Sequence, residues 1–273
     1  MNQFEFLPLV TIGQYFPTGS ILHRRDARAK LVVFTGMIIA VTFTPSLLGL
    51  LVALIAVWVG IAVARVNARI ALKGLLVPLP FLLVIALLQL LFLGSQINTV
   101  VYWSWGPIHI TQAGIWATII MLIRFIVLIL VISLSSFCVT TSEMITGLDH
   151  LLSPLKRLGI QTMDMVMAIQ VALRFLPLLA LSAERIAKAQ ASRGAEWGTK
   201  KGGLAAQVKR VIPLIVPLML TSLRRAEMMA LAMDARAYGL KNDRSSIYEL
   251  TYRNADTLFI FVGLLVMVAT IML

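Results

Sequence analysis

Cysteine and charged residues are both scarce in this sequence. The single cysteine, Cys138, excludes a disulfide within the chain and any cluster of thiolate metal ligands. Only 13% of the 273 residues are charged, about half the share in an ordinary soluble domain, whereas 59% are hydrophobic. Because so few charged side chains are available to cover a water-exposed surface, the composition favours an integral membrane protein.

The charged residues that are present are mostly basic. There are 24 Lys and Arg against 12 Asp and Glu, which gives a net charge of +12. Such an excess can indicate nucleic-acid binding, but no basic patch with interleaved aromatic residues is present. The basic residues instead flank apolar runs, as anchors of membrane spans do. The expected partner is therefore the lipid bilayer and not nucleic acid.

Long apolar runs predict about five membrane-spanning helices. The uncharged run from 31 to 64 is too long for one span, and the Thr-Pro-Ser at 44–46 divides it, because proline disfavours helix at the residue before it. Two short spans are predicted here, with a re-entrant hairpin as the alternative. Further on, the alternating segment VVYWSWGPIHI predicts a small β-hairpin. The predicted spans are 28–44, 47–65, 74–94, 113–138 and 257–273.

The basic residues also predict an orientation. Apart from Arg124, which lies inside the fourth span, all of them fall in the N-terminal segment, in a connector at 65–73 or in the stretch 139–254. Five spans then place the N-terminus and 139–254 in the cytoplasm. Arg28, Lys30 and Arg65 are expected to snorkel to that interface. Arg124 is expected to hold spans together, with substrate contact as the alternative.

The stretch 139–254 is too long for a simple loop and must have structure of its own. Thr-Thr-Ser-Glu at 140–143 is typical of a capping box that opens a helix. Two longer helical patterns follow, 161–193 and 204–237, each with a glycine just beyond its end. An all-α polytopic membrane protein is predicted, with three parts: 1–138 with four spans, a cytoplasmic coupling domain of two long helices at 139–254, and a last span at 255–273.

An internal repeat ends both long helices. Residues 183–194 and 226–237 share the pattern A-E-x-x-A-x-A-x-x-x-R at an offset of 43 residues. Each copy ends in an arginine, Arg193 or Arg236, beside a helix stop. Such an arginine can donate two hydrogen bonds to a carboxylate of a partner, or it can merely complement the helix dipole. The matched pair favours two docking tips, which we expect to lie side by side and to meet two similar partner subunits.

These features resemble the transmembrane T component of energy-coupling factor (ECF) transporters, which take up vitamins and transition-metal ions. That family carries an Ala-Arg-Gly motif at the end of each of two coupling helices. The likeness extends to GQYFPTGSILHRRDARAKL, TTSEMITGLDHLLSPLKRLGI and ALRFLPLLALSAERIAKAQASRGAEW, with Ala27 where the family usually has proline. The matching motifs depart from the family by one small residue each and are Ser192-Arg193-Gly194 and Ala235-Arg236-Ala237.

The resemblance implies a multi-subunit importer in the plasma membrane of a prokaryote, with the N-terminus of this chain in the cytoplasm. Its partners would be two ABC-type ATPase subunits and a membrane-embedded substrate-binding (S) component. The ATPases would bind ATP and Mg, so no cofactor, metal or catalytic residue is expected on this chain. The two coupling helices would cross and transmit motion through four small residues, which are Ala187, Ala189, Ala230 and Ala232.

Two other functions compete with this one. A membrane-bound enzyme is disfavoured because the sequence has no H-E-x-x-H motif and no nucleotide-binding glycine loop. A self-sufficient secondary transporter usually contains repeated groups of spans with broken helices near the midplane. Here the repeat lies in the cytoplasmic segment, so a coupling subunit is the preferred interpretation.

Overall fold

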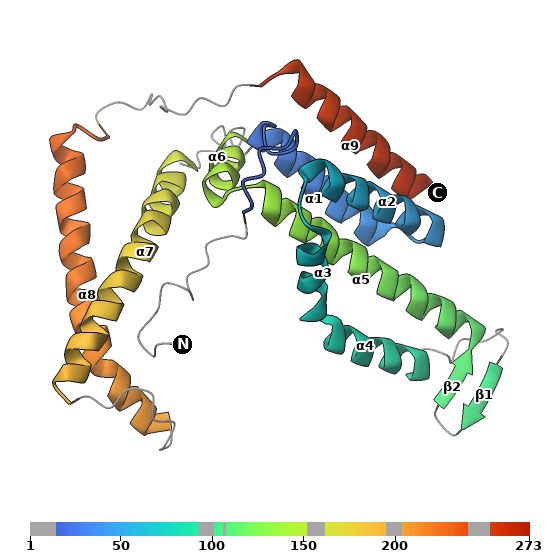
Figure 1. Ribbon diagram of the computed structural model, residues 1–273, viewed down its shortest axis with the longest axis horizontal. Helices are drawn as coiled ribbons and strands as arrows, with labels where there is room; N and C mark the ends of the chain where they lie inside the picture. The colour runs from blue at the N-terminus through green and yellow to red at the C-terminus, as the bar shows by residue number, and fades with distance from the viewer. Residues whose placement is uncertain (1–14, 93–100, 106–107, 152–161, 195–203, 240–251) are drawn as a thin grey trace. The chain divides into compact units, whose positions relative to one another are not determined.

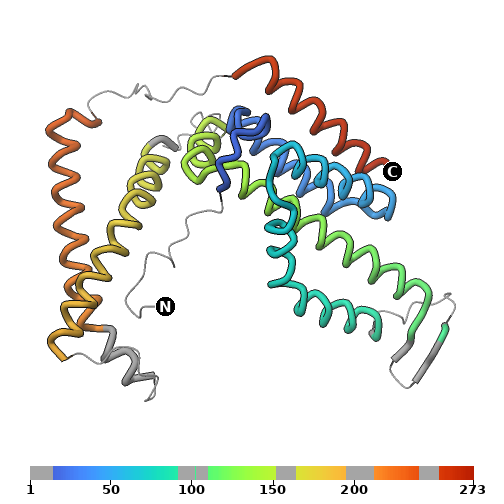
Figure 2. The backbone as a smooth tube through the Cα atoms, in the orientation of Figure 1, coloured from blue at the N-terminus to red at the C-terminus, as the bar shows by residue number. Residues whose placement is uncertain are grey.

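The chain divides into two structural units. A computed structural model describes all residues except 1–14, 93–100, 106–107, 152–161, 195–203 and 240–251 (Figures 1 and 2). The first unit, called the bundle, comprises Gly13–Leu158 and Leu250–Leu273. The second, called the helix pair, comprises Met1–Ile12 and Gly159–Glu249.

Four long helices form the centre of the bundle. They are α1 (Ala27–Phe43), α2 (Leu47–Ala64), α5 (Gln112–Cys138) and α9 (Asn254–Met272). Asp26, Ser46 and Thr111 fix where three of them begin, because each side chain accepts a hydrogen bond from a backbone N–H of the first turn. Each helix coincides with a predicted span to within three residues at either end, which confirms these four segments as helices.

The core of the bundle lies where α1, α2 and α5 meet. Leu50 of α2 and Val127, Leu130 and Phe137 of α5 are almost wholly buried there. The helices run alongside one another in Figures 1 and 2, with α9 packed against α1 and α2. Most of the outward-facing side chains on α2 and α9 are apolar as well, as expected of helices in contact with lipid.

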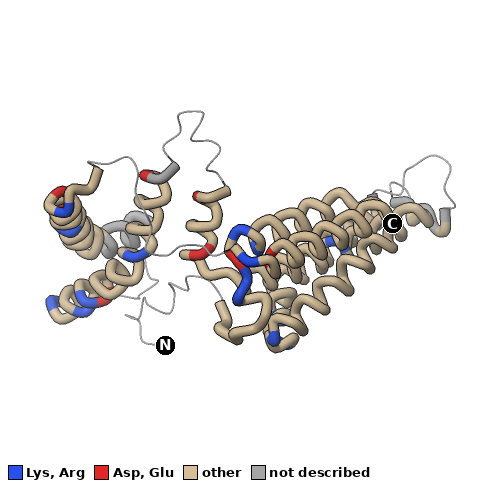
Figure 3. The backbone as a smooth tube through the Cα atoms, turned by 90° about the horizontal axis from the view of Figure 1, so that it is seen from above, with Lys and Arg blue, Asp and Glu red and all other residues tan. Residues whose placement is uncertain are grey.

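The two ends of the bundle differ in charge. At one end, Thr44 in the turn between α1 and α2 donates to the carbonyl of Thr270, near the end of α9. At the other end, Thr18 donates to the carbonyl of Ala64, which ends α2. Figure 3 shows that most Lys and Arg residues of the bundle gather at the end away from the C-terminus of the chain. This is the one-sided distribution that the sequence predicts.

The third predicted span, 74–94, is broken in the structure. It consists of α3 (Ala68–Leu76) and α4 (Leu79–Phe92), which are bent by 56° relative to each other. Pro78 and Pro80 explain the break, because proline disfavours helix at the preceding residue and lacks a backbone donor. The helix also begins earlier than predicted, at Ala68, after a capping residue, Asn67, whose side chain accepts from the N–H of Arg69. Part of the predicted connector at 65–73 is therefore helical.

The predicted β-hairpin is present. Strands β1 (Val101–Trp105) and β2 (Ile108–Thr111) pair antiparallel, with Trp105 opposite Ile108 and an irregular register between Val101 and Trp103. The Gly-Pro turn signal falls at 106–107, outside the described residues. The hairpin leads directly into α5, whose first turn Thr111 caps through a bond from the N–H of Gly114.

A short helix, α6 (Thr141–Leu151), opens the stretch that the sequence assigns to the coupling domain, yet it belongs to the bundle. Its predicted capping box is confirmed. The N–H of Glu143 bonds to the hydroxyl of Thr140, and the N–H of Thr140 bonds to the carboxylate of Glu143. α6 packs on the start of α1 at Gly147, where an added Cβ would lie 2.8 Å from Leu31 and 3.2 Å from Ala27.

The helix pair consists of two long helices that pack against each other. These are α7 (Thr162–Ser192) and α8 (Leu204–Ala235), close to the predicted 161–193 and 204–237. Pro177 lies inside α7, and Pro213 and Pro217 lie inside α8. The predicted glycine stop is confirmed at Gly194, which has a left-handed backbone just after the end of α7. Gly239 is left-handed as well, but it lies four residues beyond the end of α8, and Ala237 takes the left-handed position nearer to that end.

Several of these helices are long and apolar enough to cross a membrane. By length and composition, the described part of the chain contains four such helices, and five if the bent pair α3 and α4 forms one span. The four are α2, α5, α9 and residues Asp164–Ser192 of α7. α1, with 17 residues, is shorter and is not among them. The chain is an all-α polytopic membrane protein with one small hairpin.

Candidate docking tips and polar cluster

The first candidate tip, Ser192-Arg193-Gly194, ends α7. The N–H of Arg193 bonds to the carbonyl of Gln190, and the N–H of Gly194 bonds to that of Ala191. Gly194 has a φ of +88°, in the left-handed region that glycine adopts without steric cost. All three tip residues are exposed, so the guanidinium of Arg193 is available to a partner.

The second candidate tip, Ala235-Arg236-Ala237, ends α8 with the same geometry. Ala237 donates to the carbonyl of Asp234 and Tyr238 donates to that of Met233, which are the two bonds of a Schellman motif. Ala237 therefore occupies the left-handed position, with a φ of +59° despite its Cβ. In both tips the arginine is the last residue before a left-handed one, and both arginines are exposed.

The two tips do not lie side by side, so that expectation is wrong. A hollow of about 520 Å³ is lined both by Asp164 and Val171, near the start of α7, and by Met233 and Gly239, at the end of α8. The helices therefore run in opposite directions, as Figure 1 also shows. At 1.5 Å per residue, Arg193 lies roughly 35–45 Å along α7 from this hollow. The two arginines sit near opposite ends of the helix pair.

The two long helices are joined near their middle by Arg225 of α8. Its Nη2 donates to the hydroxyl of Ser182 at 2.9 Å, and its Nη1 donates to the carbonyl of Leu178 at 3.3 Å. The sequence analysis did not identify Arg225, because the alanine repeat used to predict the helix contact begins one residue later and does not include it. Of the four alanines predicted at the crossing, Ala187 is fully buried, whereas Ala189, Ala230 and Ala232 are exposed.

A second hollow between the helices is lined mainly by apolar and basic side chains. Its volume is about 450 Å³, and Phe175, Arg224, Met228 and Met229 are among the lining residues. Unbranched methionine side chains adapt to different shapes, so this surface suits a flexible protein contact more than a rigid small-molecule site. Within the described residues, no three His, Cys, Asp or Glu side chains are grouped so that they could hold a metal ion.

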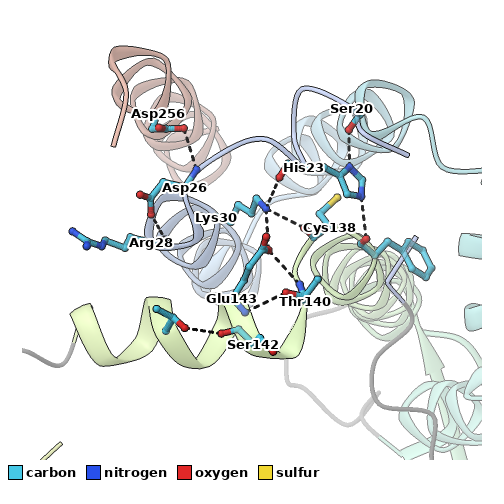
Figure 4. Close-up of polar contacts among 12 residues, drawn as sticks. Ser20, His23, Asp26, Arg28, Lys30, Cys138, Thr140, Ser142, Glu143 and Asp256 are labelled. Atoms are coloured by element: carbon cyan, nitrogen blue, oxygen red, sulfur yellow. Dashed lines mark hydrogen bonds and ion pairs between the residues drawn. The ribbon is translucent and has the colours of Figure 1, made fainter. Parts of the chain in front are cut away.

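A polar cluster occupies the basic end of the bundle (Figure 4). Its central residue is Lys30, which is 0% exposed, so the prediction that this lysine snorkels to the interface is wrong. Its Nζ donates to the carbonyls of His23 and Cys138, at 2.9 and 3.2 Å, and to Glu143 Oε2 at 3.2 Å. Burial and the nearby carboxylate of Glu143 raise the pKa of Tyr15, which keeps its phenol neutral beside the cluster.

The same cluster fastens the segment before α1 to its neighbours. His23 donates from Nε2 to the carbonyl of Phe137 in α5, and its Nδ1 lies 2.7 Å from the hydroxyl of Ser20. Asp256 of α9 accepts from the backbone N–H of Asp26 at 3.2 Å and lies 3.9 Å from the guanidinium of Arg25. These bonds connect α1, α5 and α9 at one end of the bundle.

Arg124 makes the corresponding connection farther along α5. Its Nη2 donates to the backbone carbonyl of Thr44 at 2.6 Å, in the turn between α1 and α2. A charge inside a membrane protein is costly unless it faces the interior and is hydrogen-bonded. This bond supports the interpretation that Arg124 holds helices together.

The sequence is similar to known transporter proteins over most of its length. The profile of the CbiQ family, described as cobalt transport protein, matches residues 18–247. Three curated relatives are all described as energy-coupling factor transporter transmembrane protein EcfT. That of Acidaminococcus fermentans is 34% identical, with 91% of each chain covered. That of Ruminiclostridium cellulolyticum is also 34% identical with 91% of each covered, and that of Thermotoga maritima is 35% identical, with 96% of this chain and 94% of the relative covered.

Proposed function

Because the chain belongs to the CbiQ and EcfT family of transporter membrane proteins, we propose that it couples two ABC-type ATPase subunits to a membrane-embedded S component that binds the substrate. The imported substrate is a micronutrient, either a vitamin or a transition-metal ion, and the S component selects it. This chain binds no ATP and catalyses no reaction. ATP and Mg are held by the partner ATPases.

The observation that carries this proposal is the shared geometry of the two tips. Arg193 and Arg236 each end a long helix, are followed by a left-handed residue and are exposed. A planar guanidinium that extends beyond a helix end can donate two parallel hydrogen bonds to one partner carboxylate. Two such groups at opposite ends of an antiparallel pair fit two separate sockets better than one. Each tip therefore binds one ATPase subunit.

The same arrangement provides a mechanism for coupling. When ATP binding brings the two ATPase subunits together, the tips move relative to each other. Arg225 joins the helices near their middle, so displacement of one end turns one helix against the other instead of separating them. The methionine-containing surface of α8 contacts the S component, and its movement changes the tilt of that component in the membrane.

The distribution of basic residues supports an orientation with the N-terminus and the helix pair in the cytoplasm. In the described bundle, most Lys and Arg gather at the end where α1 begins. Arg124 lies elsewhere, bonded to Thr44 in the turn between α1 and α2. Chain order then places the tips on the side where ATP is available. The proposed location is the plasma membrane of a prokaryote.

The test is recruitment of the ATPases by the full chain in native membranes. The double variant Arg193→Glu, Arg236→Glu should lose both ATPase subunits on co-purification, because each reversed charge faces an acidic socket. Arg185→Glu reverses an exposed charge on α7 away from the tip and should retain both subunits. Normal recruitment by the double variant would overturn the docking proposal, and uptake by the purified chain alone in liposomes would favour a self-sufficient transporter.

A further inference from the structure

Lys30 is a fully buried lysine whose hydrogen bonds are all satisfied. An ammonium group has three N–H donors and no acceptor. The three acceptors found here are the carbonyls of His23 and Cys138 and the carboxylate of Glu143. They belong to three separate segments, which are the stretch before α1, the last residue of α5 and the first turn of α6. One side chain therefore connects four parts of the bundle, including its own helix α1.

These hydrogen bonds lie on both sides of the short joint between α5 and α6. Only Val139 and Thr140 separate the two helices, and Val139 is extended. The N–H of Thr140 bonds to the same Glu143 oxygen that accepts from Lys30. The ammonium group thus binds both the end of the helix before the joint and the capping box of the helix after it.

Stability alone is a poor explanation for a charge in this place. Removal of an ammonium group from water is costly, and an apolar side chain of similar volume often stabilises a protein as well as a buried ion pair does. What an apolar side chain cannot supply is direction, because its contacts do not fix an angle between helices. Three directed hydrogen bonds do fix it.

A second contact fixes α6 at another point. At Gly147 the helix approaches α1 so closely that an added Cβ would lie 2.8 Å from Leu31 and 3.2 Å from Ala27. With Glu143 bonded in its first turn and Gly147 packed one turn later, α6 can neither swing nor slide without breaking a contact. In the chain, α6 is the helix that precedes α7 and its tip.

We propose that Lys30 is a positioning residue for coupling. It locks α6 at a fixed angle to α1 and α5, so that movement of the coupling helices turns the bundle instead of bending the joint at Val139 and Thr140. This role rests on the proposed function, since it requires movement that originates at the ATPases. Loss of one charged hydrogen bond corresponds to a factor of about 10 to 100 in an equilibrium, so α6 should release readily once the bonds are removed.

The experiment uses the full chain, in complex with its co-purified ATPases, in lipid nanodiscs. Hydrogen–deuterium exchange is measured by mass spectrometry in the presence of ADP and of ATP with vanadate. In the unaltered complex, we expect the nucleotide to change exchange both in the helix pair and in α1 and α2. With Lys30→Met, α6 should exchange about 10- to 100-fold faster, and the nucleotide response should remain in the helix pair but disappear from the bundle.

Two further variants make the result interpretable. Lys73→Met carries the same substitution at an exposed lysine of α3 and should behave as the unaltered chain. Glu143→Gln keeps an amide oxygen that can accept from the N–H of Thr140, and so keeps the helix cap, but it removes the counter-ion of Lys30. The buried ammonium group is then left without a compensating charge, which weakens its hold on α6. If Lys30→Met does not fold, Glu143→Gln decides the question and should show the same loss of response in the bundle.

The proposal is overturned if the nucleotide response of the bundle persists in both Lys30→Met and Glu143→Gln, or if the unaltered complex shows no such response. A merely structural role would alter the exchange of α6 and leave the response of the bundle in place. Failure of the unaltered chain to co-purify with any ATPase is a different result, because it contradicts the proposed function itself.

Discussion

Arg124 of α5 donates a hydrogen bond of 2.6 Å to the backbone carbonyl of Thr44, and so fastens the longest helix of the described bundle to the turn between α1 and α2. Two opposing effects decide what its replacement does. Loss of a charged hydrogen bond costs about 1.5–3 kcal/mol, whereas removal of a charge from the centre of a membrane helix gains about 2.5–3.5 kcal/mol. The sign therefore depends on whether the substitute keeps the charge.

We predict that Arg124→Lys is more destabilising than Arg124→Leu. Lysine keeps the charge but has a shorter reach and no planar fork, so it should cost about 1–3 kcal/mol. Leucine removes both the hydrogen bond and the charge, so Arg124→Leu should change the stability by no more than about 1 kcal/mol. Thermal unfolding of the full chain in nanodiscs measures both. A leucine variant that melts below the lysine variant would show that the charge itself contributes to the fold.

Local sequence signals were sufficient for most of the helices. The capping box at Thr140 and Glu143, the glycine stop at Gly194 and the division at Thr44 all involve residues within a few positions of one another. Their geometry depends on backbone bonds of a single turn, so it can be read from the chain directly. The break before Pro78 was missed because the surrounding leucines are apolar enough to mask a proline in a predicted span.

The relationships between helices could not be predicted in this way. The repeat identifies the end of each long helix but contains nothing about their relative direction, which is why the tips were expected side by side. Lys30 was predicted to be interfacial because its hydrogen-bond acceptors cannot be recognised in the sequence. Two of them, on Cys138 and Glu143, lie more than a hundred residues from Lys30 in the chain, and the third is on His23. A buried charge is recognised only when its partners are brought together by the fold.

The third residues of the two tips offer a matched pair of substitutions. Ala237 has a φ of +59° and Gly194 a φ of +88°, and an added Cβ at Gly194 would meet nothing within 4 Å. An alanine in the left-handed region costs about 1 kcal/mol relative to glycine. Ala237→Gly should therefore slow amide exchange in the last turn of α8, and Gly194→Ala should accelerate it in the last turn of α7. Equal exchange in all variants would contradict this account of the tips.

Gly49 and Gly60, both in α2, differ in what an added side chain would meet, which is backbone at Gly49 and a side chain at Gly60. An added Cβ at Gly49 would collide with the backbone carbonyl of Thr270, whereas at Gly60 it would meet only the flexible end of Leu134, at 2.7 Å. Alanine favours helix over glycine by about 0.5–1 kcal/mol at both sites, and overpacking costs about 1–3 kcal/mol where the neighbour cannot move. Gly49→Ala should lower the melting temperature, and Gly60→Ala should leave it nearly unchanged or raise it.

Arg225 permits a prediction that separates docking from transmission. Its two bonds to Leu178 and Ser182 hold α7 and α8 together near their middle, while both tips lie elsewhere. Arg225→Met should weaken the contact between the helices by about 1–3 kcal/mol. Because Arg193 and Arg236 remain intact, both ATPases should still co-purify with the variant.

The consequence of this weakening should appear in the response to nucleotide. With the helices free to separate, closure of the ATPases displaces each tip without turning one helix against the other. We expect the ATPase activity of the complex to stay within about twofold of normal, while the nucleotide-dependent change in amide exchange at Met228 and Met229 is lost. Arg185→Met makes the same substitution at an exposed arginine of α7 outside the hollow that contains Met228 and Met229, and should preserve that response. If the Arg225 variant instead lost its ATPases, the bond to Ser182 would be required to shape the tips, and transmission would have to run through another contact.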